Sequence, residues 1–159
     1  MYMKSSVKTY VFWIGLALGT GVLAGFLTRE ATQMYSEMIR KPPLSPSAAL
    51  FPVVWTMLYT LMGISAARVW LSKDPAEKAM GINVFITQLV VNFFWSLIFF
   101  NAQAYGFAFL WLILLWILIL WMIVLFSRVD RVAAMLQIPY LLWVTFAGYL
   151  NYGVWMLNR

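Results

Sequence analysis

Aromatic and amide side chains supply the polar chemistry within the apolar segments of this sequence. Phe51, Trp55 and Tyr59 recur at helical spacing, and Asn92 and Trp95 do so in a later segment. Indole, phenol and amide groups donate hydrogen bonds, while the rings offer flat apolar faces. Such a set suits a flat or bulky apolar ligand that carries a few carbonyl or carboxylate groups. The alternative is that the same side chains serve only for packing between helices.

A further stripe of this character lies near the C-terminus. Tyr140, Trp143, Ala147 and either Leu150 or Asn151 share one helical face, and the small side chain of Ala147 leaves room opposite Trp143. Together with the two earlier stripes, this face predicts either one aromatic pocket between helices or an ordinary packed interior.

Gln88 extends the Asn92 and Trp95 stripe by one helical turn toward the N-terminus. An amide within hydrocarbon must find a hydrogen-bond partner, so we expect this stripe to face the bundle interior or a cavity and not lipid. Bonding to a neighbouring helix would satisfy the same requirement.

Composition excludes several kinds of active site. The sequence has neither Cys nor His, which removes disulfides, thiolate nucleophiles and His-ligated metals. All carboxylates fall in predicted loops or helix ends, so a transporter coupled to an ion bound within the membrane loses support. A nucleophile paired with a base and a Gly-rich phosphate loop are also missing. The carboxylates are Glu30, Glu37, Asp74, Glu77 and Asp130.

The composition is that of an integral membrane protein. With 64% hydrophobic and 10% charged residues, the chain has more apolar surface than a soluble domain of this length can bury. We predict one all-α domain over residues 1–159, a bundle of five transmembrane helices with a long first loop as a lid. The formal charge of +6 lies in predicted loops and helix ends. We interpret these basic residues as setting the orientation of the chain in the membrane and attracting anionic lipid, and not as binding nucleic acid. The predicted helices cover about 7–27, 51–71, 80–101, 105–126 and 132–157.

The longest predicted connection runs from Thr28 to Leu50. Its first part, as far as Arg40, mixes charged and apolar residues in a way that suits a short amphipathic helix at the membrane interface. Closely spaced prolines from Pro42 to Pro46 then hold the chain extended. A long ordered loop beside aromatic helix ends is a candidate lid, although a plain connector fits the same pattern.

Glycines distinguish the first apolar segment. Gly15, Gly19, Gly21 and Gly25 permit close helix approach, either inside the bundle or between protomers. We interpret this segment as an uncleaved span, because four more apolar segments follow it. The distribution of Lys and Arg favours a cytoplasmic N-terminus and an external first loop.

The fourth and fifth predicted helices are distinguished by the spacing of their tryptophans and by a proline, respectively. Trp111, Trp116 and Trp121 step by five residues, so their rings turn around the helix and cannot form one binding face. We expect most of them to face lipid or the interface. Pro139 lies near the start of the last predicted helix and should bend it.

Three sequence blocks resemble the translocator protein family, also called the TspO/MBR or tryptophan-rich sensory protein family. They occur in the family's order and spacing and together span most of the chain. The blocks are KP at 41–42 with FPVVWTMLYTLMG at 51–63, QLVVNFFWSLIFF at 88–100, and IPYLLWVTFAGYLN at 138–151.

This resemblance implies a function. Family members are five-helix bundles, generally dimeric, that bind porphyrins such as protoporphyrin IX and haem in a pocket closed by the first loop. Several bacterial members promote light-dependent porphyrin breakdown, which would make Trp55 and Trp143 a hydrogen-bonding, redox-active pair. No other cofactor is implied, and we expect a homodimer in a bacterial cytoplasmic membrane. By position, the implied pocket comprises Tyr35, Phe51, Trp55, Tyr59, Asn92, Trp95, Trp143, Ala147 and Leu150.

The chain also departs from the family pattern. Pro43 to Ser47 stands where the family usually has a Trp and a Pro-Pro pair, which puts lid closure and ligand preference in question. The cholesterol-recognition pattern fails, because the spacing between Tyr152 and Arg159 is too long, so sterol transport is not predicted. We therefore expect a protein that binds porphyrins or similar amphipathic aromatic ligands and acts as a sensor, scavenger or low-turnover photo-oxidative degrader. The alternatives are a transporter of porphyrins or other small hydrophobic molecules, and a regulatory partner protein that uses its first helix as a contact.

Overall fold

The computed structural model describes residues 2–73 and 75–159, and within them all regular structure is helical. Five helical segments are long and apolar enough to cross a membrane, which confirms the predicted all-α bundle. Asp74, one of the predicted loop carboxylates, lies outside the described residues. The elements are α1 (Tyr2–Met38), α2 (Leu50–Trp70), α3 (Pro75–Ser96), η1 (Leu97–Asn101), α4 (Tyr105–Val129), α5 (Arg131–Met135) and α6 (Ile138–Leu157).

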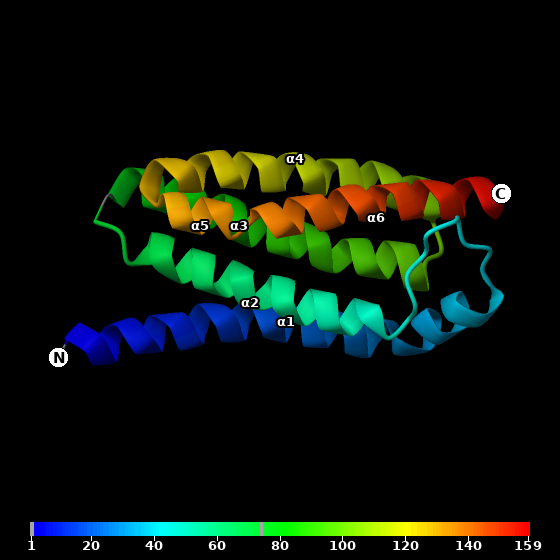
Figure 1. Ribbon diagram of the computed structural model, residues 1–159, viewed down its shortest axis with the longest axis horizontal. Coiled ribbons are helices and arrows are strands. Elements are labelled where there is room, and N and C mark those ends of the chain that lie inside the picture. The colour runs from blue at the N-terminus through cyan, green and yellow to red at the C-terminus, as the bar shows by residue number, and fades with distance from the viewer. Residues whose placement is uncertain (1, 74) are drawn as a thin grey trace.

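The long helices run roughly alongside one another, with the N-terminus and the C-terminus at opposite ends of the bundle (Figure 1). α1 packs most extensively on α2, and α4 packs on both α3 and α6. The segment between α1 and α2 crosses the end of the bundle where α6 finishes (Figure 1). This segment therefore lies where a lid over the bundle interior would have to lie.

α1 is longer than predicted, and this corrects the expectation of a separate interfacial helix after Thr28. The helix continues without a break to Met38, so the connection shrinks to residues 39–49. No Pro or Gly interrupts residues 28–38, and Gln33 donates to Glu37 one turn later at 3.1 Å. The helix ends just before Pro42 and Pro43, which cannot continue it.

The third span differs from prediction at both ends. α3 begins at Pro75, five residues before the predicted start, because proline is well accommodated in the first turn of a helix. Beyond Ser96 the helix widens into the π-helix η1, where the N–H of Ala102 donates to the carbonyl of Leu97 at 3.0 Å. A π-turn rotates the following side chains relative to an α-helix, and here it directs Phe99 and Phe100 toward the region below the connection.

The last span is broken and not merely bent at Pro139. Asp130 has an extended backbone and caps α5, where its carboxylate accepts from the N–H of Ala133 at 2.9 Å. α5 ends at Met135, and α6 starts at Ile138 with Pro139 in its first turn. Proline has no N–H to donate to the carbonyl of Met135, so the α-helical ladder stops there.

Close approach between α1 and α2 depends on a glycine of α2. A Cβ added to Gly63 would lie 2.4 Å from the Cα of Ile14, so only glycine fits at this crossing. A Cβ at Gly15 or Gly19 would meet nothing within 4 Å, so these two glycines do not make the contact inside the chain. Of the two roles predicted for them, packing within the bundle is therefore wrong for Gly15 and Gly19.

The α4 tryptophans behave differently from one another. Trp121 is half exposed on the outside of the bundle, as expected of a lipid-facing ring. Trp111 donates to the carbonyl of Val91 at 2.8 Å, and Trp116 donates to the hydroxyl of Thr145 at 2.9 Å. These two half-buried indoles therefore also tie α4 to α3 and α6, a role that the sequence did not predict.

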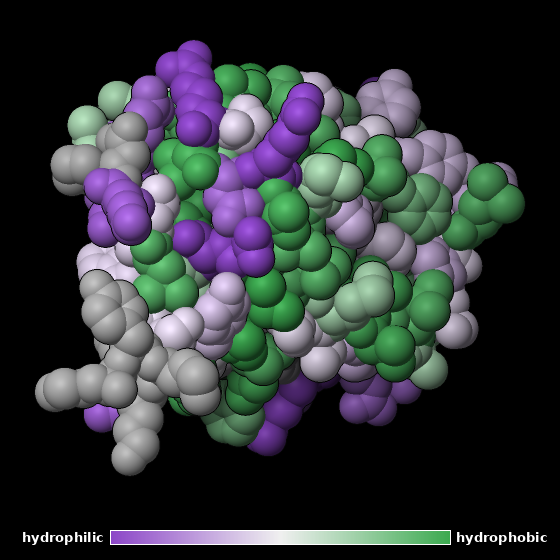
Figure 2. All heavy atoms as spheres, turned by 60° about the vertical axis from the view of Figure 1, so that its left-hand side comes forward, coloured by the Kyte–Doolittle hydropathy of each residue, from purple (hydrophilic) through white to green (hydrophobic). Residues whose placement is uncertain are grey.

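Hydrophilic side chains gather at the end of the bundle that carries the N-terminus (Figure 2). Arg128 lies 3.8 Å from Glu77, and Lys78 donates to the carbonyl of Trp70 at the end of α2. Arg68 of α2 forms a closer pair with Asp130, with 2.8 Å between nitrogen and oxygen. Burial raises the pKa of Asp130, but the Ala133 N–H and the Arg68 guanidinium together outweigh burial and hold the pKa below its ordinary value.

Candidate ligand-binding cavity

A cavity of about 620 Å³ lies inside the bundle beneath the connection between α1 and α2. Its walls come from α1, α2, α6, the end of α3 and η1, and the connection forms its cover. The volume falls within the range of pockets that hold drug-sized molecules. Most of the predicted site residues line this one cavity: Tyr35, Phe51, Trp55, Tyr59, Trp95, Trp143, Ala147 and Leu150.

α2 supplies a stack of aromatic rings along one wall. Phe51, Trp55 and Tyr59 are each one turn apart, so they project from the same face of the helix. The rings of Trp55 and Tyr59 lie 5.4 Å apart and are tilted by 32°. This wall offers flat apolar surface to a ligand, with the phenol of Tyr59 at its deep end.

Asn92 is the predicted site residue that the structure does not place on the cavity wall. It is buried behind Tyr59, and its amide nitrogen donates to the Tyr59 hydroxyl at 2.9 Å. The bond fixes the phenol ring while leaving the Tyr59 O–H proton free to be donated elsewhere. Asn92 therefore positions a wall residue in this structure, and its direct contact with a ligand stays a prediction.

α6 supplies Trp143, whose ring packs edge-on against Phe51 at 5.9 Å. The indole nitrogen of Trp143 is buried, and no described group accepts its hydrogen bond. A buried donor without a partner costs about 1–3 kcal/mol, so a ligand oxygen that accepted this bond would gain correspondingly. One turn later, Ala147 keeps the wall shallow beside the indole, as its spacing predicted.

The indole of Trp95 is already engaged by its neighbours. Its N–H donates to the side-chain oxygen of Asn151 at 3.2 Å, and the Asn151 amide donates in turn to the carbonyl of Tyr105 at 2.8 Å. Its ring stacks on Phe99 with 5.2 Å between centroids. Trp95 therefore offers a ligand its ring surface and not its hydrogen-bond donor.

The mouth of the cavity combines an aromatic ring with a cation. Tyr35, near the end of α1, packs against Phe99 and Phe100 of η1 at 5.4 Å from each. The ammonium group of Lys41 lies 5.4 Å from the centre of the Tyr35 ring and donates to the carbonyl of Ser36 at 2.5 Å. Lys41 also lines the cavity, which places a positive charge where the carboxylate of an amphipathic ligand could reach it.

The connection is attached to the C-terminal half of α6. The hydroxyl of Tyr149 donates to the carbonyl of Pro43 at 2.8 Å, and Asn158 exchanges two hydrogen bonds with the backbone of Arg40. Pro42 packs onto Gly153, where an added Cβ would lie 2.6 Å from the proline ring. These contacts hold Pro43–Ser47, the segment that departs from the family pattern, over the cavity.

The sequence did not reveal the wall that α1 contributes. Gly21, Gly25, Thr28 and Thr32 line the cavity opposite the α2 aromatics. A Cβ on Gly21 would lie 2.4 Å from the Tyr59 ring, so this glycine makes room for the phenol. Small residues spaced four apart are the only sequence signal for this wall, and the same spacing is typical of helix packing.

The cavity also reaches the outer surface between α1 and α2. Val22 of α1 lines it and is 72% exposed, and Thr56 of α2 lines it and is also exposed. Both residues belong to segments long and apolar enough to cross a membrane. The cavity is thus open on a side that faces lipid.

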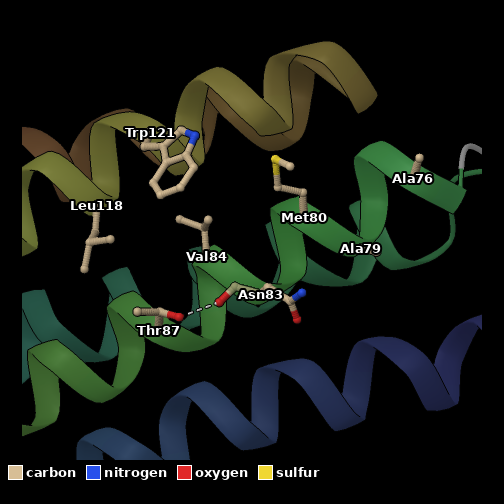
Figure 3. Close-up of a pocket in the computed structure, with 8 residues that line it drawn as sticks. All are labelled: Ala76, Ala79, Met80, Asn83, Val84, Thr87, Leu118 and Trp121. Atoms are coloured by element: carbon tan, nitrogen blue, oxygen red, sulfur yellow. Dashed lines mark hydrogen bonds between the residues drawn. The ribbon is translucent and has the colours of Figure 1, made fainter.

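A second hollow lies on the outside of the bundle between α3 and α4 (Figure 3), with a volume of about 480 Å³. Trp121 and Leu118 form the α4 side, while Asn83 and Thr87 lie on the α3 side. The Thr87 hydroxyl is used within α3, where it donates to the carbonyl of Asn83 at 2.8 Å (Figure 3). This shallow groove lacks the convergent aromatic walls of the internal cavity, which remains the better candidate site.

The fold and cavity define a helical membrane protein that spans the bilayer five times around an aromatic internal cavity. The TspO/MBR family model matches residues 13–156, and the chain belongs to this family. It is 36% identical to the tryptophan-rich protein TspO of Chlorobaculum tepidum over 98% of this chain and 99% of that protein. It is 41% identical to protein CrtK of Rhodobacter capsulatus over 77% of each chain. The human translocator protein is 32% identical over 93% of this chain and 88% of that protein.

Proposed function

We propose that this protein is a membrane receptor for porphyrins, such as protoporphyrin IX and haem, and for similar amphipathic aromatic ligands. The observation that carries the proposal is a cavity of about 620 Å³ with aromatic walls, one of which includes Trp143, whose buried indole N–H has no partner among the described residues. A planar macrocycle would lie against the α2 rings, and its oxygen atoms would accept from Trp143 or pair with Lys41. The aromatic and amide composition of the cavity supports this ligand class.

We further propose that light promotes oxidative loss of the bound porphyrin. The excited porphyrin would lose one electron, carried by way of the indoles of Trp55 and Trp143 to dioxygen, and the superoxide so formed would add to the porphyrin radical cation and oxidise the macrocycle. The indoles would serve as electron carriers and return to their starting state. Both indoles line the cavity, within reach of a ligand stacked there. No other resident cofactor is needed in this scheme, since the porphyrin itself absorbs the light.

The experiment is a titration of the purified protein with protoporphyrin IX in the dark, followed by illumination in the presence and absence of dioxygen. Binding is monitored by the porphyrin absorbance, and the Trp55→Phe, Trp143→Phe double variant is titrated alongside. We expect saturable binding and a light- and dioxygen-dependent loss that the double variant lacks. Equal affinity and equal loss in the double variant would refute the assignment to this cavity.

We also propose that the protein acts as a homodimer in a bacterial cytoplasmic membrane. The bacterial relatives that the chain resembles over most of its length support the location. The exposed apolar face of α1, which includes Val11 and Val22, offers a surface for lipid or for a second protomer. Cross-linking in native membranes, with a monomer-only result counting against it, tests the dimer.

A further inference from the structure

Below the cavity, a second set of polar side chains continues through the bundle toward the end that carries Arg68 and Asp130. It starts at the cavity floor, where Asn92 donates to Tyr59 at 2.9 Å. One turn along α3 from Asn92, the side-chain oxygen of Gln88 accepts from the hydroxyl of Tyr140 at 2.8 Å. Gln88 and Asn92 are both fully buried, so this part of the set has no contact with bulk solvent or lipid.

The set continues at the junction of α5 and α6. Gln137 precedes Tyr140 by three residues and is 0% exposed. Four residues earlier, the carbonyl of Ala133 accepts from the hydroxyl of Ser65 at 2.6 Å. Ser65 lies six residues beyond Tyr59 in α2, so this bond is about 9 Å nearer than the cavity floor to the end that carries Arg68.

The set ends at the pair formed by Arg68 and Asp130. The side chain of Arg68 is 34% exposed and that of Asp130 is 22% exposed, so the pair lies at the surface of the bundle. From Tyr59 to Arg68 the path along α2 is about 14 Å. We call this set the polar row; its members are Tyr59, Ser65, Arg68, Gln88, Asn92, Asp130, Gln137 and Tyr140.

Many hydrogen-bonding atoms of the polar row lack partners among the residues that the structure describes. They include both side-chain atoms of Gln137, the amide nitrogen of Gln88, the amide oxygen of Asn92 and the Nε of Arg68. Each buried unpartnered polar group costs about 1–3 kcal/mol, and in a membrane no lipid group can relieve that cost. Several such atoms along one path would together be a large penalty for a dry interior.

We propose that the polar row binds water molecules and forms a hydrated path from the Arg68–Asp130 pair to the floor of the cavity. Buried waters typically make about three hydrogen bonds to groups of this kind. The path supplies water and exchangeable protons to the Tyr59 end of the cavity and drains the water that an incoming ligand displaces. Arg68 and Asp130 form its outer end, and the path is independent of the lid and of the ligand's identity.

The absence of cysteine from the chain allows a clean accessibility test with silver ions, which travel through water-filled paths. Ser65→Cys places a thiol of nearly the same size in the polar row, and Gln137→Cys places one deeper. Ala67→Cys is the matched control, because Ala67 lies on the same helix and, like Ser65, is 0% exposed. Each variant is reconstituted in permeabilised lipid vesicles, and the rate at which silver blocks later maleimide labelling is measured.

We expect Ser65→Cys and Gln137→Cys to react at least about tenfold faster than Ala67→Cys, since a dry site reacts only after local opening of the core. Equal rates at all three thiols would overturn the proposal. Gln137→Leu provides a second test through the thermal unfolding midpoint. A dry row would make this variant more stable, because leucine removes unpartnered polar atoms, whereas a hydrated row predicts an unchanged or lower midpoint.

Discussion

Replacing Gly21 by alanine tests how the α1 wall positions the deep end of the cavity. The new Cβ would lie 2.4 Å from Cε2 and 2.6 Å from Cδ2 of the Tyr59 ring, well inside van der Waals contact. Tyr59 cannot simply move aside, because Trp55 packs on its ring and Asn92 holds its hydroxyl. The clash can therefore be relieved only at the expense of these contacts, and we expect the ring to be forced into the cavity and its bond to Asn92 to break.

Gly25→Ala is the matched control, one turn along the same helix and also on the cavity wall. An added Cβ at Gly25 meets nothing within 4 Å, so this change carries only the helix preference of alanine over glycine, about 1 kcal/mol in favour of folding. That preference is common to both variants. Overpacking costs about 1–3 kcal/mol and the lost hydrogen bond about 1 kcal/mol, so Gly21→Ala should be about 2–4 kcal/mol less stable than Gly25→Ala.

The two variants are compared by thermal unfolding in the same detergent, with protoporphyrin IX affinity as a second measurement. For a chain of this length, about 2–4 °C accompanies each kcal/mol, so the midpoints should differ by at least about 4 °C. Gly21→Ala should also bind porphyrin more weakly, because the displaced phenol occupies part of the cavity. Equal midpoints and equal affinities in the two variants would refute this account of the α1 wall.

Three further predictions concern the ligand, the lid and the outer ion pair. Trp143→Phe should weaken protoporphyrin IX binding in the dark about tenfold by removing one hydrogen bond to the ligand, as a titration will show; an unchanged affinity would remove Trp143 from the site. Tyr149→Phe should speed porphyrin dissociation several-fold by freeing the lid at Pro43, whereas an unchanged stopped-flow rate would mean that the lid does not control exit. The depressed pKa of Asp130 adds stability that is complete above its ordinary value of 3.8 and is lost as the pH falls through the lower folded value. Stability measured as a function of pH should therefore fall less steeply at acid pH in Asp130→Asn than in the wild type. An equally steep fall in both proteins would contradict this.

Most of the helices could be predicted from the sequence, because long apolar segments separated by charged or proline-rich turns leave few alternatives. The ends were harder to predict. The charged residues after Thr28 suggested an interfacial helix, but no residue before Pro42 interrupts the α-helical backbone, so α1 continues. The π-turn at Leu97–Asn101 was not predicted, since its apolar sequence fits an α-helix equally well; in the structure its Phe99 and Phe100 pack against Tyr35, a contact distant in sequence.

The candidate site was predicted in part for a similar reason. Helical spacing on α2 and α6 identified the faces of Trp55 and Trp143, since residues one turn apart share a face. Spacing alone could not reveal that Asn92 lies behind Tyr59, because a stripe defines a direction and not a depth. It also could not distinguish Gly21, which makes space for a ring, from Gly15, where an added Cβ would meet nothing within 4 Å.

Because the cavity opens between α1 and α2, its occupancy should follow the concentration of ligand in the bilayer and not that in water. Exposed Val22 and Thr56 border the cavity within membrane-spanning segments, so an apolar ligand dissolved in the bilayer meets the cavity without returning to water. Partitioning then raises the local concentration of the ligand before any contact forms. Occupancy should depend on the mole ratio of ligand to lipid, so adding empty vesicles at constant total ligand would lower it. The protein would thus respond to the concentration of an apolar ligand in the membrane, and not to its free concentration in the cytoplasm.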